Sequence, residues 1–370
     1  MKMHICFLVS SLCNEGPVNV MYNIIRNINF SEFKVSIITF IPEKKNSRFD
    51  EFKNLPVNIH QLAEEKFLSP LKLFQSLKQK IKEINPDALH AHCPRSLYLM
   101  GFLPQKYKRV YTIHNYPGYL QYILYGKLKG KIIIELNHLF TKLCHLPIAC
   151  SESISIEYKE KKDWNIKAIP NGASLPIWVK DKEEKNRLRN EFGLKKDVKY
   201  FIFIGRFSKE KNVDIIIDAF NNLNRKDIGL VMLGHGPMWE EQNRKKGKNI
   251  ILPGFTTRVY DYLKATDYYI SASEVEGMPN TILENMSVGN PMLLSDIPSH
   301  QEILANFKNE IVGLKINNHN PKDIIEKINE IVKLDSDQIA LTIQNVFSKK
   351  YTAKVMSQAY QEAYINLIKK

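Results

Sequence analysis

Short apolar segments alternate with amphipathic helical patterns along nearly the whole chain, and this alternation constrains the fold more than any other feature. In the first half we expect strands and helices in the order Lys2–Val9, helix Val18–Ile28, Lys34–Phe40, helix Leu71–Ile84, Ala88–His92 and Arg109–His114. A strand–helix–strand rhythm is typical of an open parallel sheet with helices on both faces.

The same rhythm starts again in the second half. After the segment Ile166–Pro170 and the charged stretch Lys180–Asn190, it continues as Tyr200–Ile204, helix Asn212–Leu223, Gly229–Leu233, Asn249–Leu252, Tyr268–Ser271 and Pro291–Ser295. A chain of 370 residues also exceeds the size at which one hydrophobic core stops growing. We therefore predict an α/β protein of two Rossmann-like, doubly wound parallel-sheet domains, residues 1–175 and 176–350, facing a central cleft.

The bulk composition is that of a globular protein, with 44% apolar and 25% charged residues. No apolar run approaches the roughly 18–20 residues that span a membrane. The apolar start of the chain lacks a small-residue cleavage site and fits a buried first strand better than a signal peptide. The five cysteines are odd in number and without C-x-x-C spacing, which indicates reduced thiols in a cytoplasmic protein.

Two carboxylates, Glu276 and Glu284, flank an expected strand-to-helix junction near the end of the second half. Glu276 falls in the loop after the strand, Pro279 suits the first helical turn, and Gly289 follows the end of the helix. Ligands bind at such junctions in α/β sheets, and free helix amides attract anions. Two carboxylates that bind separate sets of hydroxyls beside an anion site indicate a sugar nucleotide.

The string Ser273–Pro291 around these carboxylates resembles the E-x7-E signature of retaining GT-B glycosyltransferases of the group 1 or family 4 type, which include bacterial O-antigen and capsule enzymes. The resemblance implies that Glu276 binds the donor sugar and Glu284 the ribose diol. It also implies that the helix 351–370 crosses back onto the first domain. The donor sugar and phosphate would be approached by the segment Gly277, Met278, Pro279, Asn280 and Thr281.

A second donor element follows the strand that ends near Ile204. Gly205 permits close backbone approach, and Arg206 and Lys211 would neutralise a diphosphate together with a helix amino end. These residues are similar to the G-R-x-x-x-x-K element of the family. Two further turns resemble donor-side elements of the family, Gly234-His235 beside the donor and Gly254-Phe255 near the base.

The first half supplies candidate residues for the acceptor side. His114 ends a strand in a segment that looks like the T-x-H element of the family, whose histidine lies near the reacting sugar, and His92 ends the preceding strand. Gly16 follows the first strand and is a candidate amide donor to phosphate or acceptor. The family often has two glycines there, so the single glycine leaves the loop conformation open.

We expect neither a cofactor nor a metal ion. The one Asp-x-Asp, Asp335-Ser-Asp337, precedes a helical pattern and is better explained by helix capping. The departing diphosphate would then be stabilised by Arg206, Lys211 and helix amides. The resemblance implies front-face attack with retention, in which the leaving phosphate takes the proton of the acceptor.

The net charge of +14 lies mostly in the first half, where Gly118–Lys142 interleaves tyrosines and Phe140 with lysines. Such a segment suits an enzyme that acts on a lipid-linked saccharide at an anionic membrane, peripheral at the inner face of the plasma membrane. The alternative is a core stripe with a solvated basic face, which we favour for Leu68–Ile84.

Other functional classes fit the sequence less well. A non-hydrolysing sugar-nucleotide epimerase shares the predicted fold but needs carboxylates placed for proton transfer. A basic nucleic-acid-binding protein would show a helix-turn-helix, zinc-ligand or RNP-like pattern, and none occurs, so we expect no nucleic-acid partner. No G-x-G-x-x-G follows an expected strand, which disfavours a dinucleotide oxidoreductase. The leading hypothesis is a hexosyltransferase that uses a nucleoside-diphosphate sugar, UDP-linked.

Overall fold

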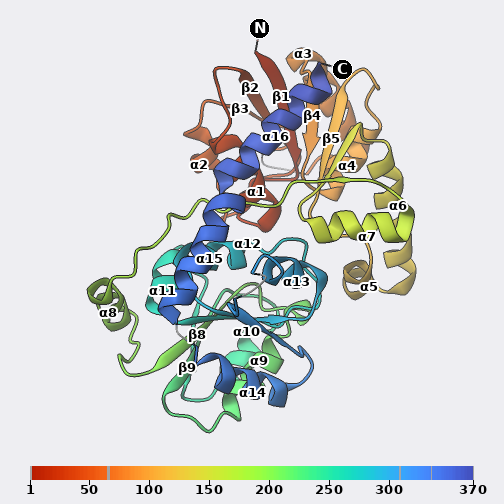
Figure 1. Ribbon diagram of the computed structural model, residues 1–370. Coiled ribbons are helices and arrows are strands. Elements are labelled where there is room, and N and C mark those ends of the chain that lie inside the picture. The colour runs from red at the N-terminus through yellow and green to blue at the C-terminus, as the bar shows by residue number, and fades with distance from the viewer. Residues whose placement is uncertain (1, 65–66, 308–309, 335, 370) are drawn as a thin grey trace. The chain divides into compact units, whose positions relative to one another are not determined.

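The computed structural model describes residues 2–64, 67–307, 310–334 and 336–369. The chain forms two compact units (Figure 1), unit 1 comprising Met1–Gly172 and Ala353–Lys370, and unit 2 comprising Ala173–Thr352. The first boundary lies three residues before the one expected from the sequence.

Unit 1 is built on a seven-stranded parallel sheet of order β3-β2-β1-β4-β5-β6-β7. Its strands are β1 Met3–Val9, β2 Phe33–Thr39, β3 Asn58–Gln61, β4 Ala88–Ala91, β5 Lys108–Ile113, β6 Leu146–Ala149 and β7 Lys167–Ala168. Its helices are α1 Gly16–Arg26, α2 Phe49–Lys53, α3 Pro70–Ile84, α4 Pro94–Gly101, α5 Tyr119–Tyr125, α6 Lys127–Lys142, α7 Glu152–Lys162 and α16 Ala353–Ile368. The strand order reverses direction between β1 and β4, as in Rossmann folds.

The last helix, α16, belongs to unit 1 although 180 residues of unit 2 precede it. It packs against α1 (Figure 1), where the Ser357 hydroxyl donates to the Ile24 carbonyl at 2.7 Å. Tyr360 and Tyr364 are fully buried, and their hydroxyls pair with Thr112 (2.9 Å) and His90 (2.7 Å) of the sheet. The helix therefore completes the core of unit 1.

Unit 2 repeats the plan with a six-stranded parallel sheet of order β10-β9-β8-β11-β12-β13. Its strands are β8 Lys199–Ile204, β9 Ile228–Leu233, β10 Ile250–Gly254, β11 Tyr268–Ser271, β12 Met292–Ser295 and β13 Gly313–Ile316. Its helices are α8 Lys182–Glu191, α9 Val213–Asn221, α10 Trp239–Lys245, α11 Val259–Ala265, α12 Asn280–Val288, α13 Pro298–Leu304, α14 Pro321–Ile331 and α15 Ser336–Lys350, with a 3-10 turn at Lys209–Lys211. Here the order reverses between β8 and β11.

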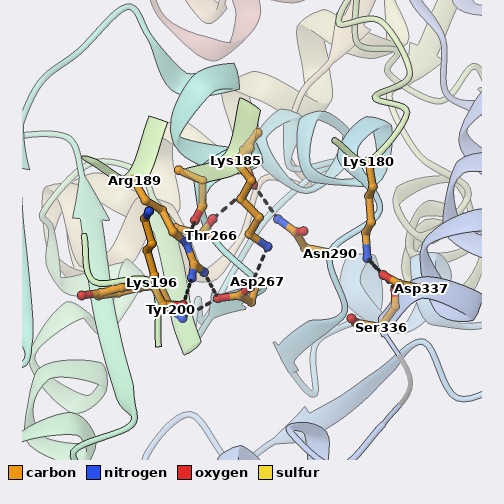
Figure 2. Close-up of polar contacts among 12 residues, drawn as sticks. Lys180, Lys185, Arg189, Lys196, Tyr200, Thr266, Asp267, Asn290, Ser336 and Asp337 are labelled. Carbon is orange, nitrogen blue, oxygen red and sulfur yellow. Dashed lines mark hydrogen bonds and ion pairs between the residues drawn. The ribbon is translucent and has the colours of Figure 1, made fainter. Parts of the chain in front are cut away.

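Asp267, just before β11, ties α8 to the sheet of unit 2 (Figure 2). Its carboxylate accepts from Lys185 at 2.6 Å, from the Arg189 guanidinium at 2.5 Å and from the Tyr200 amide at 2.7 Å. The Arg189 side chain is only 6% exposed, and its remaining nitrogens donate to two carbonyl oxygens. This cluster fixes the amino ends of β8 and β11.

Candidate functional site

Three glycines pack their backbones together at the carboxyl edge of the unit 2 sheet. The Gly205 amide donates to the Leu233 carbonyl (3.0 Å), and the Gly234 amide donates to the Gly254 carbonyl (2.9 Å). Gly234 has a φ of +126°, and a Cβ there would lie 1.9 Å from the Gly205 oxygen. A side chain at Gly234 would force the loops after β8 and β9 apart, so the three glycines form a closely packed floor of backbone at this edge.

Lys211 and Glu276 form an ion pair across the point where the strand order reverses. Lys211 ends the turn after β8 and Glu276 follows β11, and the two side chains are 21% and 15% exposed. Ser273 also donates to Glu276, at 2.8 Å. Burial acts to raise the pKa of Glu276, but Lys211 and the Ser273 hydrogen bond outweigh it and lower the pKa below its usual value. The carboxylate is therefore ionised at neutral pH.

Both donors to Glu276 reach Oε1, and no donor among the described residues reaches Oε2. The neighbouring Arg206 is exposed, and within the described part of the chain its guanidinium makes no hydrogen bond or ion pair. A carboxylate oxygen and a guanidinium with open hydrogen-bonding capacity thus lie on adjacent loops at one edge of the sheet.

Helix α12 begins behind Glu276 without a side-chain cap on its amino end. It starts at Asn280, and Pro279 is its N-cap rather than a residue of its first turn. Gly277 and Met278 are buried in the preceding loop. Thr281 is partly buried and its hydroxyl pairs with that of Tyr269 at 2.8 Å, while Glu284, one turn further, is half-buried. The amino end of a nine-residue helix thus faces the same edge.

Two aromatic groups lie on the other loops of this edge. His235 is exposed, and its ring stacks on Trp239 with centroids 5.1 Å apart. Phe255 follows β10 and is 60% exposed. An exposed phenylalanine beside polar loops is available to a planar ligand.

A buried hydrogen-bond chain supports the Glu276 loop. The Ser295 hydroxyl donates to the Ser273 carbonyl at 2.6 Å and pairs with His300 Nδ1 at 3.0 Å. His300 Nδ1 also lies 3.1 Å from the Ser295 carbonyl, which can only accept, so Nδ1 carries the proton. Burial lowers the pKa of His300 to about 4. The only sequence signal was the polar group after the strand Pro291–Ser295.

In unit 1 the structure brings His92 and His114 together at the ends of β4 and β5. His92 Nδ1 lies 3.3 Å from His114 Nε2. His92 is fully buried, and its Nε2 has no partner among the described residues, while His114 is partly exposed. Burial lowers the pKa of His114 to about 3 and that of His92 well below its usual value. Both rings are neutral at physiological pH, and only His114 is open to a ligand.

Gly16 is the first residue of α1, and the loop before it is held by a neighbouring segment. The Leu12 amide donates to both oxygens of Glu43 (3.0 and 2.9 Å), and the Asn14 amide donates to the Asn46 carbonyl (2.9 Å). Because these amides already have acceptors, the loop after β1 offers an anion less than a glycine-rich loop would.

Three further expectations concern a metal site, the Asp-x-Asp segment and the cysteines. The described residues contain no group of three or more His, Cys, Asp or Glu side chains that could hold a metal ion. Asp335 lies outside the described residues, and Asp337 in the first turn of α15 pairs with Lys180 at 2.8 Å (Figure 2). All five cysteines are free thiols.

The chain is similar to known glycosyltransferases in both units. The profile "Glycosyltransferase Family 4" matches residues 15–175, and "Glycosyl transferases group 1" matches residues 184–345. The alpha-monoglucosyldiacylglycerol synthase of Acholeplasma laidlawii is 24% identical, covering 96% of this chain and 94% of that protein. The capsular polysaccharide biosynthesis glycosyltransferase CapH of Staphylococcus aureus is 25% identical, covering 86% and 87%.

Solved structures share the fold. Anabaena HepE, crystallised with UDP and glucose, superposes with a TM-score of 0.80 at 16% identity and covers 98% of this chain and 99% of that one. The two sheets and the matched profiles define a glycosyltransferase of the GT-B fold. The chain belongs to the group 1/family 4 glycosyltransferases, a family of retaining, metal-independent hexosyltransferases that use sugar nucleotides.

Proposed function

We propose that this enzyme transfers a hexose or N-acetylhexosamine from a UDP-sugar to a lipid-linked saccharide in cell-surface polysaccharide synthesis. The donor part of this proposal rests on one observation, the ion pair between Lys211 and Glu276. This pair leaves Glu276 Oε2 open beside the unpaired Arg206. A carboxylate acceptor for sugar hydroxyls next to two cations is the arrangement that a sugar diphosphate requires.

Each side chain then has a role in donor binding. Glu276 accepts hydrogen bonds from donor-sugar hydroxyls, and Glu284 binds the ribose diol. The diphosphate lies against Arg206, Lys211 and the uncapped amino end of α12, where the helix dipole favours negative charge. The glycine floor allows its close approach, and Phe255 packs against the base.

The reaction follows from this placement. The bond between the anomeric carbon and the phosphate oxygen breaks, and its electron pair leaves with UDP. An acceptor hydroxyl attacks the same face, and its proton passes to the departing phosphate, so that configuration is retained. Arg206 and Lys211 stabilise the charge that develops on the leaving group. His114, neutral at physiological pH, serves as a hydrogen-bonding group for the sugar or the acceptor, with His92 behind it and Gly16 on the adjoining loop.

The names of the relatives support the choice of substrates. CapH is named for capsular polysaccharide synthesis, HepE was crystallised with UDP, and the Acholeplasma enzyme is named for a diacylglycerol lipid. A lipid-linked acceptor would place this chain at the inner face of the plasma membrane as a peripheral enzyme.

A thermal-shift screen across UDP, GDP, ADP and CMP, with and without their sugars, tests the donor proposal. UDP and a UDP-sugar should raise the melting temperature of the wild type, and the shift should be largely lost in Arg206→Ala. Arg244→Ala is the matched control because Arg244 is another exposed arginine of unit 2 and lies in the last turn of α10, not on one of these loops. Stabilisation by nucleic acid alone would contradict the proposal.

Product analysis tests the transfer itself. Incubation with a UDP-sugar and a lipid-linked saccharide should release UDP and extend the saccharide with retained anomeric configuration. Conversion of the UDP-sugar to its epimer without an acceptor would instead support the epimerase alternative.

A further inference from the structure

Helices α5 and α6 of unit 1 expose large apolar side chains in a group that we call the α5–α6 surface. Leu128 is 76% exposed and Ile132 is 54% exposed. The other exposed apolar members are Tyr119, Tyr122, Leu124, Tyr125, Leu136, Leu139 and Leu143. Along α6 they recur at spacings of three and four residues, so they form one stripe on one side of the helix. A contiguous apolar patch of this kind marks an interaction site.

The opposite side of α6 faces the protein and carries polar side chains beside apolar ones. Asn137, His138 and Thr141 are all less than 5% exposed. Among the described residues, His138 Nδ1 lacks a hydrogen-bond partner. Burying such groups costs free energy, whereas burying the leucines would have lowered it. Helix α6 thus exposes its leucines while three of its polar side chains are buried, which is unusual for a helix that packs on a sheet and faces water.

Helix α3 of the same unit shows the ordinary arrangement. Leu73, Leu77 and Ile81 are buried against the core, which confirms the core stripe expected for this segment. In α6, by contrast, only Ile134 and Phe140 among the large apolar side chains are buried, and Phe140 packs against Phe102 and Tyr98. The prediction that Phe140 joins the exposed aromatic group was therefore wrong.

Lysines flank the apolar stripe of α6. Lys127, Lys129, Lys131 and Lys142 are exposed, against the single acidic residue Glu135. The Tyr119, Tyr122 and Tyr125 side chains each combine an apolar ring with a polar tip, which suits the boundary between water and hydrocarbon. Leucines bordered by tyrosines and lysines are typical of a helix that lies in the interface of an anionic membrane.

We propose that the α5–α6 surface docks on an anionic lipid bilayer, with the α6 stripe and the α5 tyrosines in the headgroup region and the lysines against lipid phosphates. The excess of lysines argues for anionic lipid over a second copy of this basic chain. Docking would be peripheral, since no described helix is long and apolar enough to cross a membrane. This inference does not depend on the transfer reaction, and its test requires neither donor nor acceptor.

Vesicle sedimentation of the full chain tests the docking. Wild type should sediment with vesicles of phosphatidylglycerol and phosphatidylcholine, less so at high salt, and weakly with phosphatidylcholine alone. Lys127→Gln/Lys129→Gln/Lys131→Gln should weaken binding to anionic vesicles on the order of 100-fold. Leu128→Ser/Ile132→Ser should weaken it at least about 10-fold, because two exposed apolar side chains no longer enter the interface.

Matched variants in unit 2 separate this surface from total charge and hydrophobicity. Lys196→Gln/Lys226→Gln/Lys248→Gln removes three exposed lysines, and Leu341→Ser removes a side chain that is 71% exposed. Both should bind vesicles like wild type. All variants should keep the wild-type melting temperature, since none of the changed side chains is buried.

Three outcomes would overturn the docking proposal. One is a wild type that ignores anionic vesicles at low salt. Another is binding that the unit 2 controls weaken as much as the α5–α6 variants do. The third is a dimer by light scattering that Leu128→Ser/Ile132→Ser converts to a monomer without changing vesicle binding, which would make the surface a contact between copies of the chain.

Discussion

Two partly buried carboxylates flank strand β11 along the chain, Asp267 before it and Glu276 after it, and they are held in opposite ways. At the amino end, both oxygens of Asp267 are occupied by Lys185, Arg189 and the Tyr200 amide (Figure 2). At the carboxyl end, the two donors to Glu276 share one oxygen and leave the other open. The side chains are exposed to a similar extent, 20% and 15%.

The difference shows that burial and an ion pair do not by themselves mark a functional site. Asp267 joins α8 to the sheet, and both of its oxygens already accept hydrogen bonds from the protein. Glu276 keeps an acceptor free at the edge where the strand order reverses, which is where α/β sheets bind ligands. A functional carboxylate is better recognised by an oxygen that receives no hydrogen bond from the protein and so stays open to a ligand.

The largest expected effect is on protein stability and concerns Asp267, at the amino end of β11. Asp267→Ala should lower the free energy of unfolding by about 3–5 kcal/mol, because it leaves the Arg189 guanidinium buried without its anion. Urea denaturation followed by circular dichroism measures the change. Asp227→Ala, which breaks the exposed pair with Arg225, should cost less than about 1 kcal/mol. Equal losses in the two variants would remove the structural role assigned to Asp267.

At the carboxyl end, the expected effect is on catalysis. Glu276→Gln keeps the shape of the side chain but removes its charge, and should lower kcat about 100- to 1000-fold if the carboxylate acts in the transition state. The free energy of unfolding should change by less than about 1 kcal/mol. Steady-state kinetics and urea denaturation on the same preparation check both. If Glu276→Gln lost as much stability as Asp267→Ala, Glu276 would have a structural role like that of Asp267, and the contrast between the two carboxylates would be wrong.

A pH effect should also appear at the carboxyl end. Burial lowers the pKa of His300 from 6.5 to about 4, although the charge of Glu276 acts to raise it. Below pH 6.5 the unfolded chain binds a proton that folded His300 does not, so stability falls as the pH drops toward 4. Between pH 6.5 and 5 the wild type should lose about 1–2 kcal/mol more than His300→Gln. Parallel stability curves for the two proteins would contradict this assignment.

The smallest effect is expected at Ser295, two hydrogen bonds away from Glu276. Ser295→Ala removes the donor to the Ser273 carbonyl and should lower kcat about 10-fold, equivalent to one hydrogen bond, with little change in the KM for the donor. Ser295→Thr should restore the rate. Ser299→Ala is the matched control, because the buried Ser299 hydroxyl has no partner among the described residues. A change in KM alone would show that Ser295 acts on binding and does not position Glu276.

Much of the fold and part of the candidate site could be predicted from local patterns. The strand–helix rhythm predicts two parallel sheets, since strands buried on both faces are apolar runs. The motifs identified Glu276, Arg206 and Lys211 because glycines and a helix start lie at fixed offsets from them. The same patterns did not separate the role of Asp267 from that of Glu276, since each is an acid beside an apolar strand.

The sequence by itself determined the alternation, the two sheets and the residue types at the carboxyl ends of their strands, because these depend on neighbours in the chain. Only the tertiary structure decided which hydrogen-bonding groups stay open to a ligand. Ser295 contacts the Glu276 loop from the end of β12, and His300 of α13 supports Ser295 in turn. Periodicity shows that α6 has two faces, but it cannot show that the leucine stripe stays exposed while Asn137, His138 and Thr141 pack inward. Both outcomes depend on contacts between segments that are distant in sequence.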